Sequence, residues 1–293
     1  MSDRTALVLD ISGSRTMLAL VSAAGELSDV HEVRNVTYNA AEYWPAIQAA
    51  AAAMARPGLV GIGVSFGGPV DRDGNVISVH VPGWAGIDVA GGLSARLDLP
   101  AKVENDANCG ALGEYWYGAW GPVNTLVFMT CSTGIGSGIV SDGRLFKGAR
   151  GLAGEVGHNT VNPLGRPCVC GSRGCLERQC SGSAMAERSG LPNAKALFDA
   201  VADGDHEAEA VLEVVFEDYG RGIAAVQHAY DPDVITIGGG VSLAGHRLTE
   251  PVAAQARRWL MAERREHLRL EAASLGLHSQ LYGAATLVLE PSR

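Results

Sequence analysis

The chain has 293 residues, of which 47% are hydrophobic and 19% are charged, so it is long enough for two domains and is not an intrinsically disordered chain. A net charge of −9 and the scarcity of Lys/Arg runs argue against a nucleic-acid-binding protein, which would carry a basic patch. No apolar run approaches the ~20 residues that cross a bilayer, and no signal peptide is visible, so we expect a cytoplasmic protein.

The first part of the chain predicts a sheet that begins with a β-meander. Residues 7–9 and 17–21 predict strands joined by the polar turn 10–15, and a glycine-containing turn leads into a third strand. The elements expected after the meander are the helix 43–54, the strands 60–64 and 101–104, and the helix 108–117.

The strand–turn–strand pattern recurs later in the chain. Residues 126–129 and 138–140 predict strands on either side of the turn 132–136, with a similar order of apolar and polar residues. Such a repeat indicates two similar α/β domains. We place them at 1–117 and 118–280, with a helix at about 281–293 returning to the first domain. The later elements expected are the helix 211–230, the strand 234–237, and the helices 251–263 and 283–289.

The strongest chemical signal is a histidine followed by three closely spaced cysteines. Their spacing is His-x9-Cys-x-Cys-x4-Cys, and Gly171 and Gly174 allow a short loop to wrap around one ion. Four such ligands are typical of a closed, structural Zn²⁺ site, whereas a catalytic zinc keeps one position open. The predicted ligands are His158, Cys168, Cys170 and Cys175.

Carboxylates gather next to these features. Glu-Asn-Asp-Ala-Asn at 104–108 follows a predicted strand, whose alternation would point Glu104 and Asp106 the same way. A helix-capping aspartate would produce a similar pattern. Glu155 and Glu177 flank zinc ligands, so zinc would help to fix both side chains in space, although two solvated surface acids would look the same. Acids and amides together suit a polyhydroxylated ligand.

Three glycine-containing turns follow predicted strands, at residues 10–15, 132–138 and 238–240. Backbone N–H groups in such turns bind phosphate oxygens, and ligands of α/β sheets lie at strand ends. None of these turns has the Gly-Lys-Ser/Thr of a Walker motif, and each alone is compatible with an ordinary turn. The three together favour a nucleotide site.

These features resemble those of the ROK family, which groups bacterial sugar kinases with sugar-responsive repressors. The matching motifs are Glu-Asn-Asp-Ala-Asn at 104–108, Gly-Glu-Val-Gly-His at 154–158, Cys-x-Cys-Gly-x-x-Gly-Cys-Leu-Glu at 168–177 and Ile-Gly-Gly-Gly-Val at 237–241. The resemblance implies an α/β, actin/hexokinase-like fold: two ribonuclease-H-like domains with an inter-domain cleft. The family's repressors add an N-terminal helix-turn-helix. Because Asp10 lies near the start of this chain, we expect no such module.

The resemblance also implies roles for single residues. Asp106 would take the proton from a sugar 6-hydroxyl, and Asp10 would organise Mg²⁺ through water. His158 would use one ring nitrogen for zinc and the other for the sugar. The implied sugar contacts are Gly68, Asn105, Asp106, Glu155, His158 and Glu177. The implied nucleotide contacts are Asp10, Gly13, Ser14, Arg15, Thr133, Gly134, Gly238, Gly239 and Gly240.

Two of the phosphate turns depart from the family pattern. The first is Asp-Ile-Ser-Gly-Ser-Arg, where the family usually has Asp-Ile-Gly-Gly-Thr-Lys. A side chain at Ser12 would obstruct close approach of a phosphate to the backbone. In the second turn, Ser132 and Ser137 replace two glycines. These departures leave open a sugar-binding sensor that lacks kinase activity.

The predicted activity is ATP-dependent phosphorylation of a hexose at the 6-hydroxyl, with glucose as the first expectation. N-acetylmannosamine, N-acetylglucosamine and fructose are the alternative substrates. A zinc-dependent hydrolase is disfavoured because four protein ligands leave no open position on the metal. We expect ATP, Mg²⁺ and structural Zn²⁺ as cofactors, a homodimer because the family is often dimeric, and neither nucleic-acid nor membrane partners.

Overall fold

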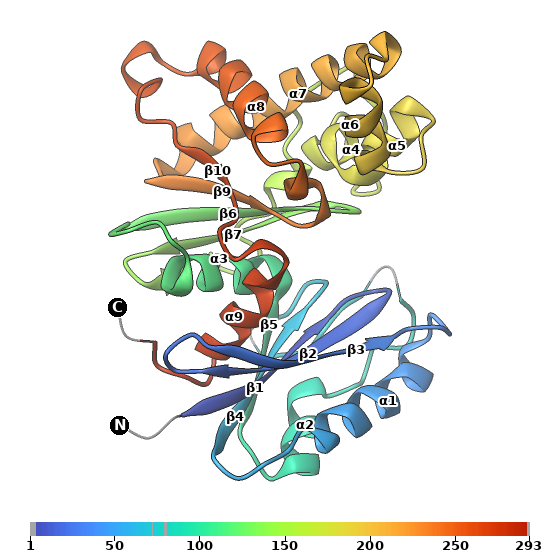
Figure 1. Cartoon of the computed structure of the whole chain (residues 1–293), viewed down its shortest axis with the longest axis vertical. Helices are drawn as coiled ribbons and strands as arrows, with labels where there is room; N and C mark the ends of the chain where they lie inside the picture. Colours follow the sequence, from blue (N-terminus) through green and yellow to red (C-terminus); the bar gives the residue numbers. More distant parts are fainter. Residues whose placement is uncertain (1–3, 72, 79–80, 292–293) are drawn as a thin grey trace. The chain divides into compact units, whose positions relative to one another are not determined.

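The structure is a computed structural model that describes residues 4–71, 73–78 and 81–291 (Figure 1). These divide into two compact units. The first unit contains the chain up to Ala119, the segment Leu145–Ala153 and the chain from His278 onward. The second contains Trp120–Arg144 and Gly154–Leu277. Within the described part of the chain, no helix is both long and apolar enough to cross a membrane.

The first unit is built on a five-stranded sheet with the order β3-β2-β1-β4-β5. Its strands are β1 (Thr5–Ile11), β2 (Arg15–Ser22), β3 (Leu27–Arg34), β4 (Leu59–Phe66) and β5 (Ala101–Asn105). The first three form the antiparallel meander that the sequence predicts, and β4 and β5 add to it in parallel.

Helices cover both faces of this sheet (Figure 1). They are α1 (Ala40–Ala53), α2 (Val89–Leu97), α3 (Asp106–Tyr117) and α9 (Ser279–Thr286). Leu7 and Leu9 belong to the core shared with α1 and α2, whereas Ala6 and Val8 belong to the core shared with α3 and α9. The alternation of side chains along β1 therefore supplies apolar groups to both layers.

The second unit repeats this topology, with the sheet order β10-β9-β6-β7-β8. Its strands are β6 (Thr125–Cys131), β7 (Ile135–Ser141), β8 (Arg144–Leu145), β9 (Val234–Gly238) and β10 (Leu270–Ala272). β6 and β7 are antiparallel, while β9 and β10 continue the sheet in parallel. Read from β8, the order equals that of the first unit, so the predicted pair of similar α/β domains is confirmed.

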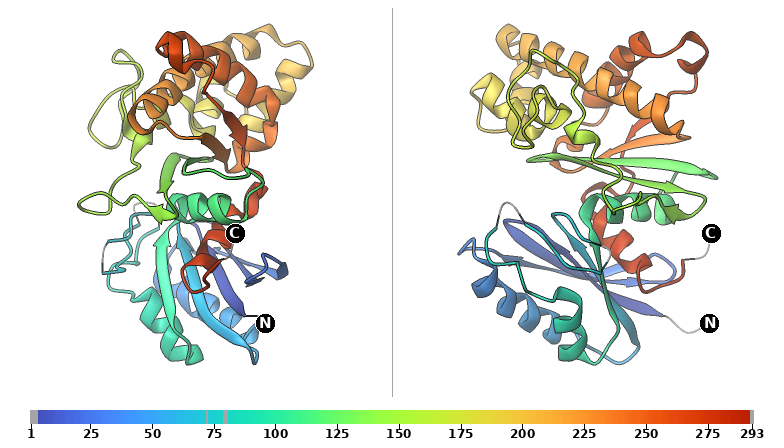
Figure 2. Two further views of the ribbon diagram at one scale, coloured as in Figure 1. Left: turned by 90° about the vertical axis from the view of Figure 1, so that its left-hand side faces the viewer. Right: turned by 180° about the vertical axis from the view of Figure 1, so that it is seen from behind.

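The helices of the second unit gather on one side of its sheet (Figure 2). They are α4 (Leu176–Cys180), α5 (Gly182–Ser189), α6 (Ala194–Ala202), α7 (His206–Tyr230) and α8 (His246–Trp259). Four short 3₁₀ turns also occur in the later part of the chain: η1 (Val156–His158), η2 (Gly240–Ala244), η3 (Ala262–Arg264) and η4 (Gly276–His278). The helix expected at 211–230 lies within α7, whose Val215, Tyr219 and Ile223 are fully enclosed in the core.

Some boundaries differ from those predicted. α3 begins at Asp106, two residues early, because Asn105 caps the helix. α8 ends at Trp259 instead of 263, because the next residue adopts an extended backbone. α9 begins at 279 and ends at 286 rather than covering 281–293, of which 292–293 lie outside the described residues. The segment 145–153, expected within the domain 118–280, packs with the first unit, where Lys147 pairs with Glu104.

Candidate active site

Asp106 is held at the start of α3 by the amide next to it in the sequence. The side-chain oxygen of Asn105 accepts hydrogen bonds from the backbone N–H groups of Ala107 (3.0 Å) and Asn108 (3.1 Å). Its Nδ2 donates to Asp106 Oδ1 and to the carbonyl of Gly68, both at 3.0 Å. Asn105 therefore fixes the Asp106 carboxylate and the backbone at Gly68 at the same time.

The strand that carries Glu104 ends at Asn105, so strand alternation does not relate the directions of Glu104 and Asp106. Glu104 is only 4% exposed. Its Oε1 accepts from the Asn105 N–H (2.9 Å) and from Asn108 Nδ2 (3.0 Å), while Oε2 pairs with Lys147 Nζ. Sequence reasoning missed Lys147, since nothing in its neighbourhood along the chain marks it as the partner of a buried acid.

Two carboxylates lie close to one another at the strand ends of the first unit. Burial, together with the negative charge of Asp10, raises the pKa of Asp106 to about 7. Burial also raises the pKa of Asp10, and a hydrogen bond from Ser65 opposes this shift. Ser65 Oγ donates to Asp10 Oδ1 at 2.6 Å from the directly adjacent position on β4. A carboxylate with a pKa near neutrality suits general base catalysis.

The cysteine–histidine cluster comes together in the second unit. The four ligand atoms of His158, Cys168, Cys170 and Cys175 all lie within 4.8 Å of one another. His158 Nδ1 is 3.7 Å from Cys168 Sγ, and the sulfurs of Cys170 and Cys175 are 3.6 Å apart. Thiolates about 2.3 Å from a tetrahedral Zn²⁺ are roughly 3.8 Å apart. The spacing of these four residues is therefore compatible with one zinc ion.

The backbone of this segment explains how it wraps so tightly. Gly171 and Gly174 have φ values of +90° and +68°, which favour glycine. A Cβ at Gly174 would also lie 1.6 Å from the carbonyl oxygen of Asn162. The turn is closed by the N–H of Cys168, which donates to the carbonyl of Ser172 at 2.8 Å. Both glycines are thus required by the fold of the loop.

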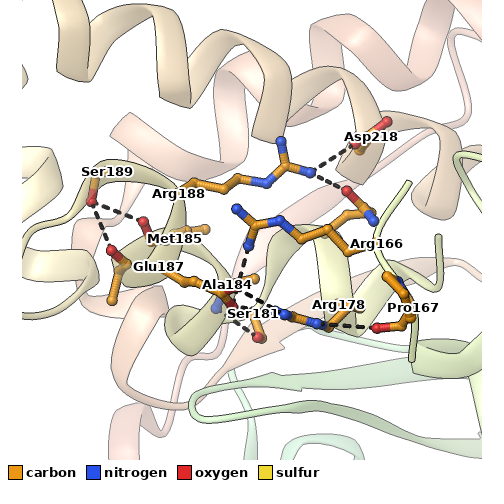
Figure 3. A network of polar contacts seen from close by, with 12 residues as sticks. Arg166, Pro167, Arg178, Ser181, Ala184, Met185, Glu187, Arg188, Ser189 and Asp218 are labelled. Carbon is orange, nitrogen blue, oxygen red and sulfur yellow. Dashed lines mark hydrogen bonds and ion pairs between the residues drawn. The ribbon is translucent and has the colours of Figure 1, made fainter. Parts of the chain in front are cut away.

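An arginine network joins the same segment to the neighbouring helices (Figure 3). Arg178 of α4 donates from Nε to the carbonyl of Pro167 at 3.3 Å and from Nη2 to Glu187 of α5 at 3.0 Å. Arg188 of α5 lies 3.5 Å from the buried carboxylate of Asp218 on α7. The segment that carries the three cysteines is therefore held by side-chain contacts of Arg178. These contacts are separate from the cluster of potential metal ligands.

The acids beside the cluster have distinct environments. Glu155 precedes η1, and its Oε2 lies 3.9 Å from His158 Nε2, the ring nitrogen that is not directed at Cys168. Glu177 lies on α4, where its Oε2 accepts from the N–H of Ile135 at 2.9 Å. One oxygen of Glu177 is therefore engaged with β7.

Of the three consecutive glycines that begin at the last residue of β9, only Gly240 has open space where a side chain would be. A Cβ at Gly238 would lie 2.4 Å from the Phe128 ring, and one at Gly239 would lie 2.5 Å from the Cys131 carbonyl oxygen. Gly239 also has a φ of +82°. Packing alone therefore accounts for the first two glycines, and Gly240 is the position that leaves backbone accessible to a ligand.

The sequence profile of the ROK family matches residues 6–291. The chain belongs to the ROK family. It is 31% identical to a glucokinase of Halalkalibacterium halodurans, over 98% of this chain and 96% of that protein. It is 32% identical to an N-acetylmannosamine kinase of Escherichia fergusonii, over 97% and 98% of the two chains. The structure of a ROK glucokinase from Streptomyces griseus, in complex with glucose and AMPPNP, superposes with a TM-score of 0.84 at 30% identity, covering 97% of this chain and 99% of that chain. These matches confirm the predicted actin/hexokinase-like fold.

The site residues implied by the ROK resemblance divide between the two units. The first unit brings Asp10, Gly68, Asn105 and Asp106 together at the ends of β1, β4 and β5. The second unit brings together the cysteine–histidine cluster, its two neighbouring acids and the turn with Thr133 and Gly134. In that turn a Cβ at Gly134 would lie 2.3 Å from Glu177 Oε2.

The side chain of Ser12 is hydrogen-bonded within the turn 10–15. Ser12 Oγ donates to the carbonyl of Arg15 at 2.8 Å, and the Ser12 N–H donates to the same oxygen at 2.9 Å. The space beside Gly13 stays open, since a Cβ there would meet only Val81, at 3.6 Å. Arg15 itself pairs with Glu32 at 3.2 Å on the surface. The Ser12 hydroxyl is therefore engaged with the backbone of its own turn.

Proposed function

We propose that this protein is an ATP-dependent hexose kinase that phosphorylates glucose at the 6-hydroxyl. The observation that carries the proposal is the carboxylate of Asp106, which is fixed by Asn105 and has a pKa raised to about 7 by burial and by Asp10. Similarity over nearly the whole chain to glucokinases, one of them solved with glucose and AMPPNP, supports both substrates.

In this mechanism Asp106 accepts the proton of the 6-hydroxyl as the phosphoryl group is transferred. Phosphoryl transfer depends mainly on positioning and charge neutralisation, so the other residues bind and orient. We assign the ring hydroxyls to Glu155, His158 and Glu177, with Asn105 and Gly68 supporting the base. Asp10 would organise Mg²⁺ through water.

For the nucleotide, we assign the phosphates to the turn 10–15 of the first unit and to the turn 132–138 of the second unit. The residues concerned are Gly13, Ser14, Arg15, Thr133 and Gly134, with Gly238, Gly239 and Gly240 near the adenosine. Gly240 is the strongest of the last three, because the space beside it is open. Sugar binding would exclude water from the γ-phosphate.

Zinc has a structural role in this proposal. His158, Cys168, Cys170 and Cys175 would supply four ligands and leave no position for a substrate or water, so the ion would hold the segment that carries Glu155 and Glu177. A homodimer in the cytoplasm belongs to the same proposal, and light scattering of the purified protein tests the dimer.

N-acetylmannosamine is the second candidate substrate, because a kinase for that sugar is 32% identical over 97% of this chain. Product analysis distinguishes the two. The protein is incubated with Mg²⁺-ATP and either sugar, and phosphorus NMR identifies the phosphate ester. We expect glucose 6-phosphate from the wild type and almost none from Asp106→Asn. If only N-acetylmannosamine 6-phosphate formed, N-acetylmannosamine would replace glucose as the proposed substrate. The absence of any sugar phosphate would contradict the proposed activity.

A further inference from the structure

Ser137 is one of the positions at which this chain has serine where the ROK pattern usually has glycine. It lies in β7 and is 5% exposed. Its hydroxyl donates a hydrogen bond of 2.7 Å to the carbonyl of Gly154, the residue directly before Glu155. The serine side chain is therefore engaged with the turn that carries a proposed sugar ligand, and not with the turn proposed to bind phosphate.

The turn from Gly154 to Gly157 lies directly on the backbone of β7. A Cβ at Gly154 would be 2.4 Å from the carbonyl oxygen of Ser137, and one at Gly157 would be 1.9 Å from that of Ile135. Ile135 and Ser137 are two residues apart, so they present the same face of the strand. Glu155 and Val156 are therefore flanked by two glycines that both lie close to the backbone of β7.

The second proposed sugar acid contacts the same end of the strand. Glu177 Oε2 accepts from the Ile135 N–H at 2.9 Å. The preceding turn is closed by the Ser132 N–H, which donates to the Gly134 carbonyl at 2.9 Å. The first residues of β7 thus join the proposed nucleotide turn to the segments that carry Glu155 and Glu177.

We propose that Ser137 is a positioning residue for the sugar: its hydroxyl fixes the peptide between Gly154 and Glu155 and thereby the direction of the Glu155 carboxylate. This inference rests on the proposed sugar kinase activity. It also predicts that the serine leaves ATP binding unimpaired, since its hydroxyl is directed at the Gly154 carbonyl.

Replacing Ser137 separates this role from obstruction of the phosphate turn. One buried hydrogen bond contributes a net factor of about 2–12 to an equilibrium. Ser137→Gly and Ser137→Ala should therefore raise the KM and Kd for glucose by about 2–12-fold, while kcat and the KM for ATP change by less than about 2-fold. If the serine instead obstructed phosphate, Ser137→Gly would lower the KM for ATP and leave glucose binding unchanged.

Ser141→Ala is the matched control, because Ser141 lies at the other end of β7 and its hydroxyl is 3.0 Å from that of Thr125. Calorimetry with glucose alone measures binding without turnover, steady-state kinetics give both KM values, and a thermal scan reports folding. We expect weaker glucose binding in both Ser137 variants and wild-type binding in Ser141→Ala.

Wild-type glucose affinity in the Ser137 variants would overturn the inference, as would equal weakening in Ser141→Ala or loss of folding in both Ser137 variants. If the wild-type protein itself neither bound nor phosphorylated glucose or N-acetylmannosamine, the proposed function would fail instead. The two failures are therefore distinguishable.

Discussion

The carboxylate of Asp106 is restrained by two hydrogen bonds to its Oδ1, one from Asn105 Nδ2 at 3.0 Å and one from the Ala107 N–H at 2.8 Å. These bonds favour the ionised form, but burial and the charge of Asp10 outweigh them and raise the pKa to about 7. A base of this kind is largely ionised above neutrality and still accepts a proton readily.

The raised pKa predicts the pH dependence of the reaction. As the pH falls below about 7, Asp106 becomes protonated in the free enzyme, so kcat/KM for glucose should fall, approaching tenfold per pH unit. Steady-state rates between pH 5 and 9 at constant ionic strength measure this. A profile that is flat from pH 5.5 to 8 would exclude Asp106 as the base that sets the rate.

Asp106→Asn keeps the size of the side chain and removes the base. Turnover should fall by about 10²–10⁴-fold, the usual contribution of a positioned base, while glucose affinity measured by calorimetry stays near the wild-type value. Turnover at the wild-type rate would contradict the assignment.

The same substitution should change stability in a pH-dependent way. Because the folded-state pKa of Asp106 is raised, burial disfavours the ionised form, and stability is lost as the pH rises from about 4 through 7. Asp106→Asn should therefore raise the melting temperature at pH 8 more than at pH 5. Thermal scans of both proteins at the two pH values test this, and a difference of opposite sign would contradict burial of the charge.

At the scale of elements, the segment from Arg166 to α4 is held in two ways. Its potential zinc ligands converge within 4.8 Å, and Arg178 joins it to α5 through Glu187. Cys170→Ser should lower the zinc content below one ion per chain and weaken glucose binding, because the ion would hold both His158 and the start of α4.

Val169→Ser is the control for the cysteine variant, since Val169 lies between two of the ligands and is 95% exposed. Metal analysis by mass spectrometry and calorimetry with glucose should show wild-type values for it. Unchanged zinc content in Cys170→Ser would refute the ligand set.

Lys147 provides a second prediction for an element, the segment 145–153. Lys147→Met would leave Glu104 buried without its cationic partner, and it should therefore destabilise the protein by about 1–3 kcal/mol. It should also lower kcat, because Glu104 supports Asn105 and Asn108. Lys147→Arg should restore both, and Lys102→Met, an exposed lysine on β5, should change neither. Denaturant unfolding and kinetics measure the effects; equal behaviour of Lys102→Met and Lys147→Met would contradict the role.

The sequence predicted those parts of the site that are contiguous along the chain. The cysteine cluster and the run 104–108 carry their chemistry within a few residues, so spacing alone indicated them. Two other contacts depend on the packing of segments that are separate in sequence: the ion pair of Lys147 with Glu104 and the hydrogen bond of Ser137 to Gly154. Neither contact leaves a pattern in the local sequence. The expectation that Glu104 and Asp106 point the same way extended strand alternation past Asn105, the last residue of β5.

At the scale of the whole molecule, two units share one strand order, and the chain belongs to the ROK family. The repeated strand–turn–strand pattern predicted this duplication, because each meander lies within about 30 residues. The assignment of 145–153 to the first unit was not predictable, since it depends on contacts between segments distant in sequence.

The most direct test of this account is sugar-dependent release of ADP in a coupled assay with Mg²⁺-ATP. The panel contains glucose, mannose, fructose, allose, N-acetylglucosamine and N-acetylmannosamine, each measured with the wild type and Asp106→Asn. The account predicts strong release with glucose that is lost in the variant. Silence across the panel, with a sugar still raising the melting temperature, would show a sugar-binding protein without kinase activity and would contradict it.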